Sequence, residues 1–243
     1  MVNLCIDSGN TRLKAAIFQE NILVEQFIIN NLNDFETLLV QYPAIEYIGV
    51  CDVSNKLEIL TDFFQAKEKK IFNINAGVTF PFSIRYETPQ TLGPDRLCAV
   101  AGAFSYSGKK PVFVINAGTC ITYDFLHPLN GYQGGAISPG LHMRLKSMHE
   151  FTQKLPLVEL NWPQHIEGAS TTAALLSGAC WGLIDEIEGR ISRYKEKYGD
   201  VEVFISGGDA LLLAEHIKSN IFASPSLVLE GINKILIYNV TNA

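Results

Sequence analysis

The feature that most constrains the fold of this chain is a strand-turn-strand pattern that occurs twice. The first copy alternates apolar and other residues up to Ile6, pauses in the turn 8–11 and becomes apolar again from Leu13. The second copy has the same three parts, at 112–115, 116–119 and 121–125. Alternation with a period of two residues predicts strands, and turns rich in small residues between them predict β-hairpins.

The position of the second copy carries the argument, because strand-turn-strand units are common in proteins. It begins near mid-chain, so the simplest account is two similar lobes that each open with a hairpin. Pro111 follows the run 107–110 and marks the junction. We therefore expect one lobe over 1–109 and another over 110–243, with a ligand-binding cleft between them.

The rest of the chain alternates between helical and extended patterns. The spacing of apolar residues predicts helices over 32–42, 56–69, 96–104, 141–151, 171–198 (one helix or two) and from Ala210. Further strands are predicted over 45–50, 71–74 and 201–205, and a glycine-rich loop over 131–140. This alternation indicates the α/β class with a mainly buried sheet.

Composition narrows the possible partners and the location. The 243 residues are 47% hydrophobic, which is enough to build a sizeable core. A formal charge of −6 without any lysine or arginine run argues against nucleic acid or an anionic membrane as the main partner. The N-terminus lacks a basic segment, and no apolar stretch would span a bilayer, so we expect a cytoplasmic protein.

Both turns are suited to a polyphosphate, because Gly9 and Gly118 have no side chain that would block approach to backbone N–H groups. Asp7 ends a buried strand beside the first turn and is placed to hold Mg²⁺, which favours a carboxylate together with substrate phosphates. The alternative role of Asp7 is a turn cap that accepts hydrogen bonds from Gly9 or Asn10. The residues alone leave both roles open.

Asp95 lies in the segment 92–96, just before an apolar helix. One interpretation is an N-cap that accepts a hydrogen bond from the first free N–H groups of the helix. The other is a carboxylate that orients and deprotonates an alcohol attacking a γ-phosphate, with Arg96 holding substrate or charge nearby.

Two further glycine patterns have both an ordinary and a functional interpretation. Gly207 and Gly208 lie between a strand and a helix, where the backbone can pass close to an adenosine or phosphate group, or can simply turn. The small residues Ala174, Gly178 and Gly182 share one helix face, which suits close packing within the chain or a dimer contact.

Taken in order, these motifs resemble those of type III pantothenate kinase. Residues 7–14 fit the DxGNTxxK phosphate motif of that family, and 116–119 look like its second phosphate motif. Tyr86 followed by Gly93-Pro94-Asp95-Arg96 looks like its tyrosine and GxDR substrate motif. Segments 134–140, 168–171 and 207–209 also match, so the resemblance covers nearly the whole chain.

The resemblance implies duplicated ribonuclease-H-like (actin-like ATPase) domains, usually a homodimer, that phosphorylate pantothenate with ATP and Mg²⁺ in the first step of coenzyme A synthesis. It makes Asp95 the general base. The pantothenate contacts it implies are Tyr86, Gly93, Pro94, Asp95, Arg96 and Thr171. The ATP contacts it implies are Asp7, Ser8, Gly9, Asn10, Thr11, Arg12, Leu13, Lys14, Gly118, Thr119, Gly207 and Gly208.

The chain departs from the family pattern at two positions. Asn116 stands where the family usually has an aspartate that holds K⁺ or NH₄⁺, so a monovalent-cation site here is in doubt. Pro94 stands where alanine or valine is usual, and we expect this change to have little effect because proline is well accommodated at the first position of a helix.

Two other functions stay open at this point. The first is another small-molecule kinase of the same superfamily, acting on a sugar or a carboxylic acid with the same ATP machinery. The second is a non-catalytic regulator that uses the nucleotide as a switch, which the presence of both Asp7 and Asp95 argues against.

Overall fold

The structure is a computed structural model, and it describes residues 1–75 and 77–242. It has the expected α/β fold, built on two five-stranded sheets, and the chain divides into two compact units. Unit 1 comprises the segments Met1–Val112, Asp124–Gly134 and Ser226–Ala243, and unit 2 comprises Phe113–Tyr123 and Gly135–Pro225. Among the helices of the described residues, none combines the length and the apolar character that a membrane crossing needs.

The first sheet lies in unit 1 and has the strand order β3-β2-β1-β4-β5. Its strands are β1 (Val2–Ser8), β2 (Leu13–Gln19), β3 (Ile22–Ile29), β4 (Ile45–Asp52) and β5 (Lys70–Asn73). Strands β1, β2 and β3 are antiparallel neighbours, whereas β4 is parallel to β1 and β5 is parallel to β4. The first predicted hairpin is therefore confirmed, and β3, which the sequence analysis did not identify, extends it.

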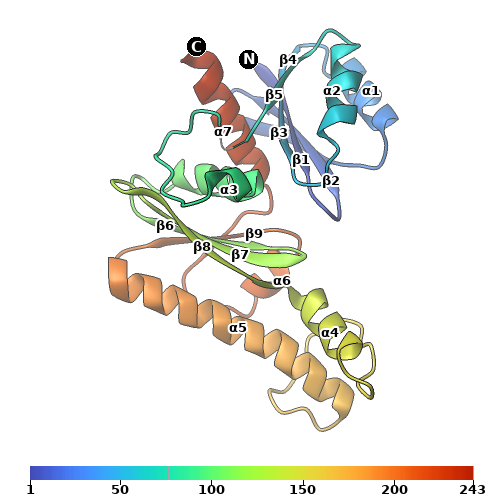
Figure 1. Ribbon diagram of the computed structural model, residues 1–243, viewed down its shortest axis with the longest axis vertical. Coiled ribbons are helices and arrows are strands. Elements are labelled where there is room, and N and C mark those ends of the chain that lie inside the picture. Colours follow the sequence, from blue (N-terminus) through green and yellow to red (C-terminus); the bar gives the residue numbers. More distant parts are fainter. Residues whose placement is uncertain (76, 243) are drawn as a thin grey trace. The chain divides into compact units, whose positions relative to one another are not determined.

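One face of this sheet is covered by α1 (Leu32–Gln41) and α2 (Leu57–Gln65) (Figure 1). Leu4 and Ile6 of β1 point to the same face, because alternate residues of a strand share a face, and they belong to one apolar cluster with Phe64 of α2. All three side chains are fully buried. Burial of this face stabilises the sheet in the register that its apolar pattern demands.

The other face is covered by two helices that lie against each other, α3 (Pro94–Phe104) and α7 (Leu227–Thr241) (Figure 1). Their backbones approach unusually closely at two glycines. A methyl group on Gly231 of α7 would lie 1.7 Å from the carbonyl oxygen of Cys98, and one on Gly102 of α3 would lie 2.4 Å from that of Leu227. Neither glycine has room for a side chain. Helix α3 begins at the predicted substrate motif, and this close packing holds it firmly against the sheet.

The second sheet has the order β10-β9-β6-β7-β8. Its strands are β6 (Val112–Ala117), β7 (Cys120–His127), β8 (Gly131–Pro139), β9 (Glu202–Ser206) and β10 (Phe222–Ala223). Read from β8, this order repeats that of the first sheet, with two hairpin-connected strands beside each central strand. The duplication that the two hairpins predicted is therefore visible in the topology of the sheets.

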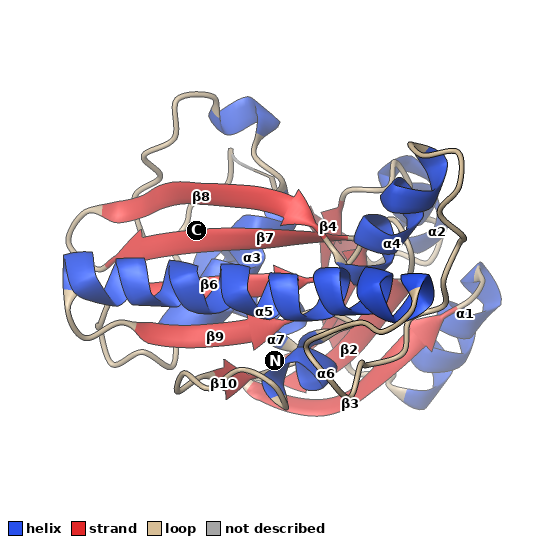
Figure 2. Ribbon diagram, turned by 90° about the horizontal axis from the view of Figure 1, so that it is seen from below, coloured by secondary structure: helices blue, strands red, loops and turns tan. Residues whose placement is uncertain are grey.

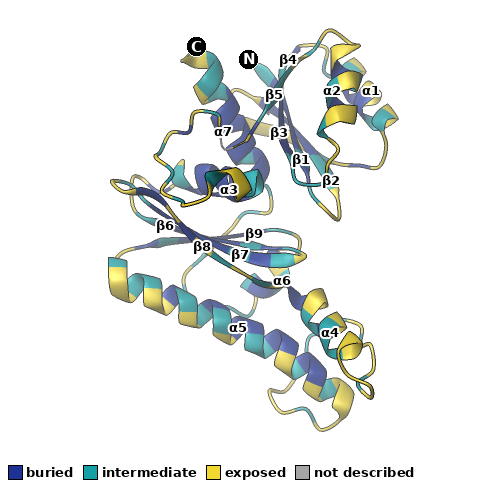
Figure 3. Cartoon of the chain, in the orientation of Figure 1, coloured by how far each residue is buried: buried dark blue, intermediate teal, exposed yellow. Residues whose placement is uncertain are grey.

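In unit 2 the long helix α5 (Thr171–Tyr198) runs along the second sheet (Figure 2). Tyr194 of this helix stacks on Phe113 of β6 with ring centroids 4.2 Å apart, and the guanidinium carbon of Arg190 lies 4.3 Å from the ring centre of Tyr123. The helix alternates buried and exposed positions along its length (Figure 3), as an amphipathic helix should. The smaller helices of this unit are α4 (Leu141–Glu150) and α6 (Ala210–Ala214).

Several local predictions need correction. The glycine-rich segment 131–140, expected to be a loop, is the edge strand β8, because pairing with β7 outweighs the weak strand preference of glycine. The segment 171–198, for which the sequence left one helix or two open, is one helix of 28 residues. Helix α7 was not predicted, although its strongly apolar sequence is typical of a helix buried on most sides.

The compact units do not follow the order of the chain. Helix α7 comes last in the sequence but belongs to unit 1, and residues 124–134 belong to unit 1 as well. A division into compact units reports which residues pack together, whereas a division into duplicated lobes reports how the chain arose. The lobes 1–109 and 110–243 therefore stay a prediction.

Candidate functional site

The first glycine turn is a tight connection between β1 and β2. Asp7 pairs with Lys14 across the two strands, and Ser8 pairs with Leu13. The backbone N–H of Gly9 donates to the carbonyl oxygen of Arg12 over 3.2 Å. Gly9 therefore closes the turn through the backbone, and this N–H, one of the two donors that the turn-cap interpretation offered to Asp7, is used by Arg12.

The surroundings of Asp7 disfavour the charged form of its carboxylate. Burial raises its pKa to about 6, the charge of Lys14 opposes that rise, and the charge of Asp95 adds to it. Asp7 and Asp95 are therefore close enough to repel each other within unit 1. A cation between or beside such carboxylates would relieve the repulsion, which is the ordinary setting of a metal-binding aspartate.

Asp95 occupies the second position of α3 and does not cap it. The N-cap is Gly93, and Pro94 is the first helical residue. The Asp95 carboxylate accepts a hydrogen bond from the backbone N–H of Arg96. A methyl group on Gly93 would lie 2.5 Å from Oδ1 of Asp95, so glycine leaves room for this carboxylate. The N-cap interpretation is wrong because Pro94 starts the helix two residues before Arg96, where the apolar pattern placed its start.

The environment of Asp95 raises its pKa above the ordinary range of an aspartate. Burial is the main cause and the nearby charge of Asp124 contributes, while the backbone N–H and the side chain of Arg96 act in the opposite direction. A carboxylate of raised pKa is a stronger proton acceptor than an exposed one, which is the property a general base needs.

The side chain of Arg96 is held by the buried carboxylate of Asp124. Its Nε lies 2.9 Å and its Nη2 2.8 Å from Oδ1 of Asp124, and the hydroxyl of Tyr132 donates to the same oxygen over 2.6 Å. Asp124 is completely buried and Arg96 is 6% exposed. Burial opposes the charge on Arg96, but Asp124 raises its pKa above the ordinary value, so the guanidinium stays protonated.

Tyr86 completes this group from the segment before α3. It hydrogen-bonds Arg96, and its ring lies 6.1 Å from that of Tyr132. Gly134 has a φ of +83°, and a methyl group there would lie 3.3 Å from the Tyr86 ring. The structure thus places Tyr86 against Arg96, the neighbour of Asp95, in unit 1, and the contact of these residues with a substrate stays a prediction.

Asp124 and Tyr132 were missed by the sequence analysis, although one signal pointed to the first. Asp124 stands inside the apolar run 121–125, and a carboxylate in a buried strand requires a buried cationic partner. The sequence could not say which cation, because Arg96 is 28 positions away. Tyr132 had no such signal.

The second glycine turn is enclosed within unit 2 by two other glycines. The backbone N–H of Gly140 donates to the carbonyl of Thr119 over 3.1 Å, and a methyl group on Gly140 would lie 2.2 Å from the Gly118 carbonyl oxygen. Gly207 has a φ of +99°, and a methyl group there would lie 2.1 Å from the carbonyl oxygen of Ala117. The structure thus brings together Gly118, Thr119 and Gly207.

Thr171 begins α5, in unit 2, while Tyr86 and the segment 93–96 belong to unit 1. The N-cap of α5 is Ser170, whose hydroxyl accepts a hydrogen bond from the backbone N–H of Ala173 over 3.2 Å. Thr171 is exposed at this helix start. Its predicted contact with the substrate is therefore a proposal that concerns residues of both units.

Solved structures with the same fold define the class of this protein. A putative Baf family transcriptional activator from Campylobacter jejuni superposes with a TM-score of 0.61 over 99% of this chain and 100% of its own, at 23% identity. A ROK family glucokinase from Streptomyces griseus gives 0.57 over 97% and 99%, at 10% identity. With the duplicated sheets, these likenesses place the chain among proteins of the actin-like and ROK-like fold.

Closer comparisons give the family. A family model described as type III pantothenate kinase matches residues 3–193. A type III pantothenate kinase from Christiangramia forsetii is 40% identical over 99% of this chain and 100% of its own length, and one from Bacteroides fragilis strain YCH46 is 40% identical over 98% of each. The chain belongs to the type III pantothenate kinase family.

Proposed function

We propose that the protein transfers the γ-phosphoryl group of ATP to the hydroxyl group of pantothenate, with Asp95 as the general base. The observation that carries this assignment is the partly buried carboxylate of Asp95, whose pKa is raised and which lies beside the ordered Arg96. The proton of the hydroxyl passes to Asp95 as the hydroxyl oxygen attacks phosphorus and the bond to ADP breaks.

Asp7 would hold Mg²⁺ together with the phosphates of ATP. Its carboxylate is partly buried and is repelled by Asp95, so a divalent cation beside it would stabilise the charged form. The ion supplies charge neutralisation for the transferred group when ATP is bound. Among the described residues, no cluster of three or more His, Cys, Asp or Glu side chains could hold a metal.

Both glycine turns would bind the phosphates through backbone N–H groups. The first turn would act through Ser8, Gly9, Asn10, Thr11 and Arg12, with the strand residues Leu13 and Lys14, and the second through Gly118 and Thr119. Gly207 packs against the second turn and would bring Gly208 to the nucleotide as well. Lys14 pairs with Asp7 and would supply a positive charge near the phosphates.

Pantothenate would contact Tyr86, Gly93, Pro94, Arg96 and Thr171 in addition to Asp95. Asp124 fixes Arg96 in one orientation, so the guanidinium can meet a polar substrate group without first losing conformational freedom. Asn116 could offer only an amide oxygen to K⁺ or NH₄⁺, and we therefore expect weak dependence on such a cation.

We also propose that the protein works as a cytoplasmic homodimer. In α5, a methyl group added to Gly178 or Gly182 would meet no atom within 4 Å, so this face is open to a second chain. In the same unit, Phe151, the C-cap residue of α4, is 87% exposed and Ile166 is 62% exposed. Exposed apolar side chains and an open helix face of small residues both suit a contact between subunits. Light scattering of the purified protein would give the mass directly.

A panel of acceptors tests the function. Purified protein is assayed for ADP release with pantothenate, sugars and small carboxylic acids at matched concentrations, with and without Mg²⁺. We expect turnover with pantothenate and far less with any other acceptor. Preference for a sugar or another acid would make the protein a different small-molecule kinase, and ATP binding without turnover on any acceptor would favour the regulator.

A further inference from the structure

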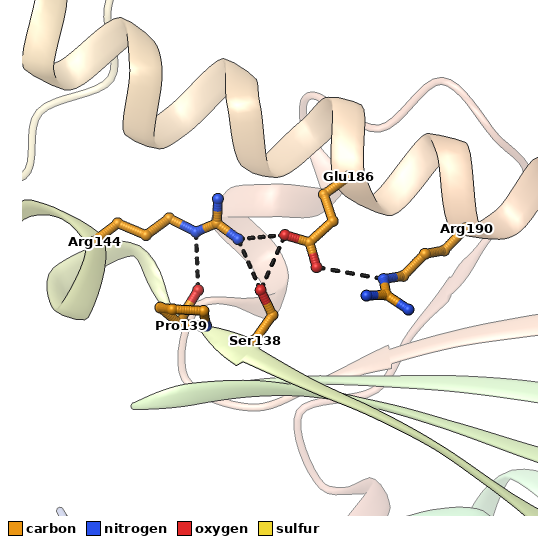
Figure 4. Close-up of polar contacts among 5 residues, drawn as sticks. All are labelled: Ser138, Pro139, Arg144, Glu186 and Arg190. Atoms are coloured by element: carbon orange, nitrogen blue, oxygen red, sulfur yellow. Dashed lines mark hydrogen bonds and ion pairs between the residues drawn. The ribbon is translucent and has the colours of Figure 1, made fainter.

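A cluster of polar and charged side chains in unit 2, which we call the hub, lies outside the residues assigned to the substrates (Figure 4). It consists of Ser138, Arg144, Glu186 and Arg190. The carboxylate of Glu186, on α5, accepts hydrogen bonds from Nη2 of Arg144, from the hydroxyl of Ser138 over 3.0 Å and from Nε of Arg190 over 3.3 Å. Burial alone would raise the pKa of Glu186, but the hydrogen bonds from Arg144 and its other partners hold it below the ordinary value. Glu186 is therefore a stable anion around which the two arginines are arranged.

Arg144 connects this hub to the backbone at the end of β8. Its Nε donates to the carbonyl oxygen of Pro139 over 2.9 Å, and its Nη2 also donates to the hydroxyl of Ser138 over 3.0 Å. The Arg144 side chain is 20% exposed and that of Glu186 is 23% exposed, so solvent screens this pair less than a surface pair. One guanidinium thus holds two consecutive residues of β8 against α5 (Figure 4).

The next residue after this held segment is Gly140, which touches the second glycine turn. Gly140 donates to Thr119 over 3.1 Å and approaches the Gly118 carbonyl so closely that no side chain could be added. Pro139 has a restricted φ, so the displacement of Ser138 would be passed on to Gly140 rather than absorbed between them. The hub is therefore connected to the turn through three consecutive residues.

We propose that Arg144 and Glu186 are positioning residues for the ATP phosphates, acting through Ser138, Pro139 and Gly140 on the turn at Gly118 and Thr119. Neither side chain needs to touch the nucleotide. Removing either one frees the end of β8 and loosens the turn, so the backbone N–H groups lose their alignment with the phosphates. The inference rests on the proposed function of the turn as a phosphate site.

The test compares Glu186→Gln, Arg144→Met and the double variant with a matched control on α4, the helix that carries Arg144. Lys146→Met removes a cation from α4 whose partner Glu150 lies 3.4 Å away in an exposed i,i+4 pair. Each protein is measured for the KM of ATP, the KM of pantothenate and the thermal midpoint. The Kd of Mg²⁺-ATP is measured by calorimetry without any acceptor, so this measurement does not depend on which acceptor the enzyme uses.

We expect the KM and Kd of ATP to rise about tenfold or more in both single variants, because small displacements of binding groups have effects of this size. The KM of pantothenate should change less than about twofold, and the double variant should resemble the single variants because they break one unit. Lys146→Met should match the wild type. An unchanged Kd of ATP would overturn the proposal, as would equal losses for both substrates, which a merely structural role predicts.

The proposed function can fail separately from this inference. If the wild type does not phosphorylate pantothenate but binds Mg²⁺-ATP, and the hub variants weaken that binding, the positioning role stands and the acceptor assignment fails.

Discussion

Arg96 and Asp124 form a buried ion pair in which Nη2 and Oδ1 are 2.8 Å apart, directly behind the residue that we assign as general base. Asp124 comes from β7, and Arg96 follows Asp95 in the first turn of α3. The pair joins the helix start to the strand, so the placement of Asp95 depends on a residue that does not itself belong to the substrate motif.

Replacing Asp124 with asparagine should destabilise the protein by about 3–5 kcal/mol, because it leaves the buried guanidinium of Arg96 without a counter-charge. Urea unfolding measures the change in the free energy of unfolding. The control is Glu36→Gln, which breaks an exposed ion pair with Lys67 at 2.8 Å and should cost no more than about 1 kcal/mol. Equal losses of unfolding free energy in the two variants would show that the ion pair of Arg96 with Asp124 is not critical for stability.

Asp95→Asn should lower phosphoryl transfer by at least about a hundredfold, the ordinary effect of losing a general base. The Kd of ATP should stay nearly the same, since the change removes a proton acceptor and leaves the shape of the site intact. Steady-state kinetics and calorimetry give the two quantities. Turnover close to that of the wild type would rule out the base role.

Asp7→Asn should change stability in a pH-dependent way in the absence of nucleotide. The pKa of Asp7 is about 6 in the folded chain against an ordinary value of 3.8, so the folded state binds its proton more tightly. The stabilisation from this proton is complete below pH 3.8 and is lost as the pH rises through about 6. Above that range the asparagine variant, which has no charge to bury, should be more stable than the wild type by roughly 1–3 kcal/mol.

Urea midpoints at pH 7.5 and pH 4.5 in a metal-chelating buffer test the prediction for Asp7. The two proteins should differ most at the higher pH, and the difference should be much smaller at the lower one. Asp62→Asn, at an exposed position of α2, is the control and should show little difference at either pH. The Asp7 variant should also need more Mg²⁺ for turnover; an unchanged Mg²⁺ requirement would speak against the metal role.

Gly207→Ala and Gly208→Ala make a matched pair of adjacent substitutions. Alanine at position 207 must adopt a φ near +99° and would lie 2.1 Å from a backbone oxygen, whereas position 208 is open. We expect Gly207→Ala to cost at least about 2 kcal/mol of folding free energy and Gly208→Ala less than about 1 kcal/mol. Thermal unfolding ranks them, and a reversed order would contradict the close packing on Ala117.

Asn116→Asp should make activity depend more steeply on K⁺ than it does in the wild type. An amide oxygen lacks the negative charge that helps replace the lost water of a monovalent cation. Kinase assays in sodium- or Tris-based buffer, titrated with KCl at constant ionic strength, compare the two proteins. Tight, saturable activation of the wild type equal to that of the variant would show that backbone carbonyls suffice and that our electrostatic argument fails.

The sequence by itself predicts features that depend on neighbours in the chain. The two hairpins follow from alternation and small turn residues, and α1 follows from its apolar spacing, so each was found within a few residues of its observed bounds. The family follows from motif order, because those motifs are short and local. The proposal that the glycine turns bind phosphates likewise rests on residues that are consecutive in the sequence.

Only the tertiary structure decides the features that depend on residues far apart in the chain. Glycine-rich β8 becomes a strand because β7 supplies its hydrogen bonds, and α7 closes unit 1 because Gly231 meets the backbone of Cys98. Asp124 gains its role from Arg96, which no local pattern could assign to it. The physical reason is that pairing, close packing and buried charge are properties of two groups brought together, and their free energy appears only once the fold places both.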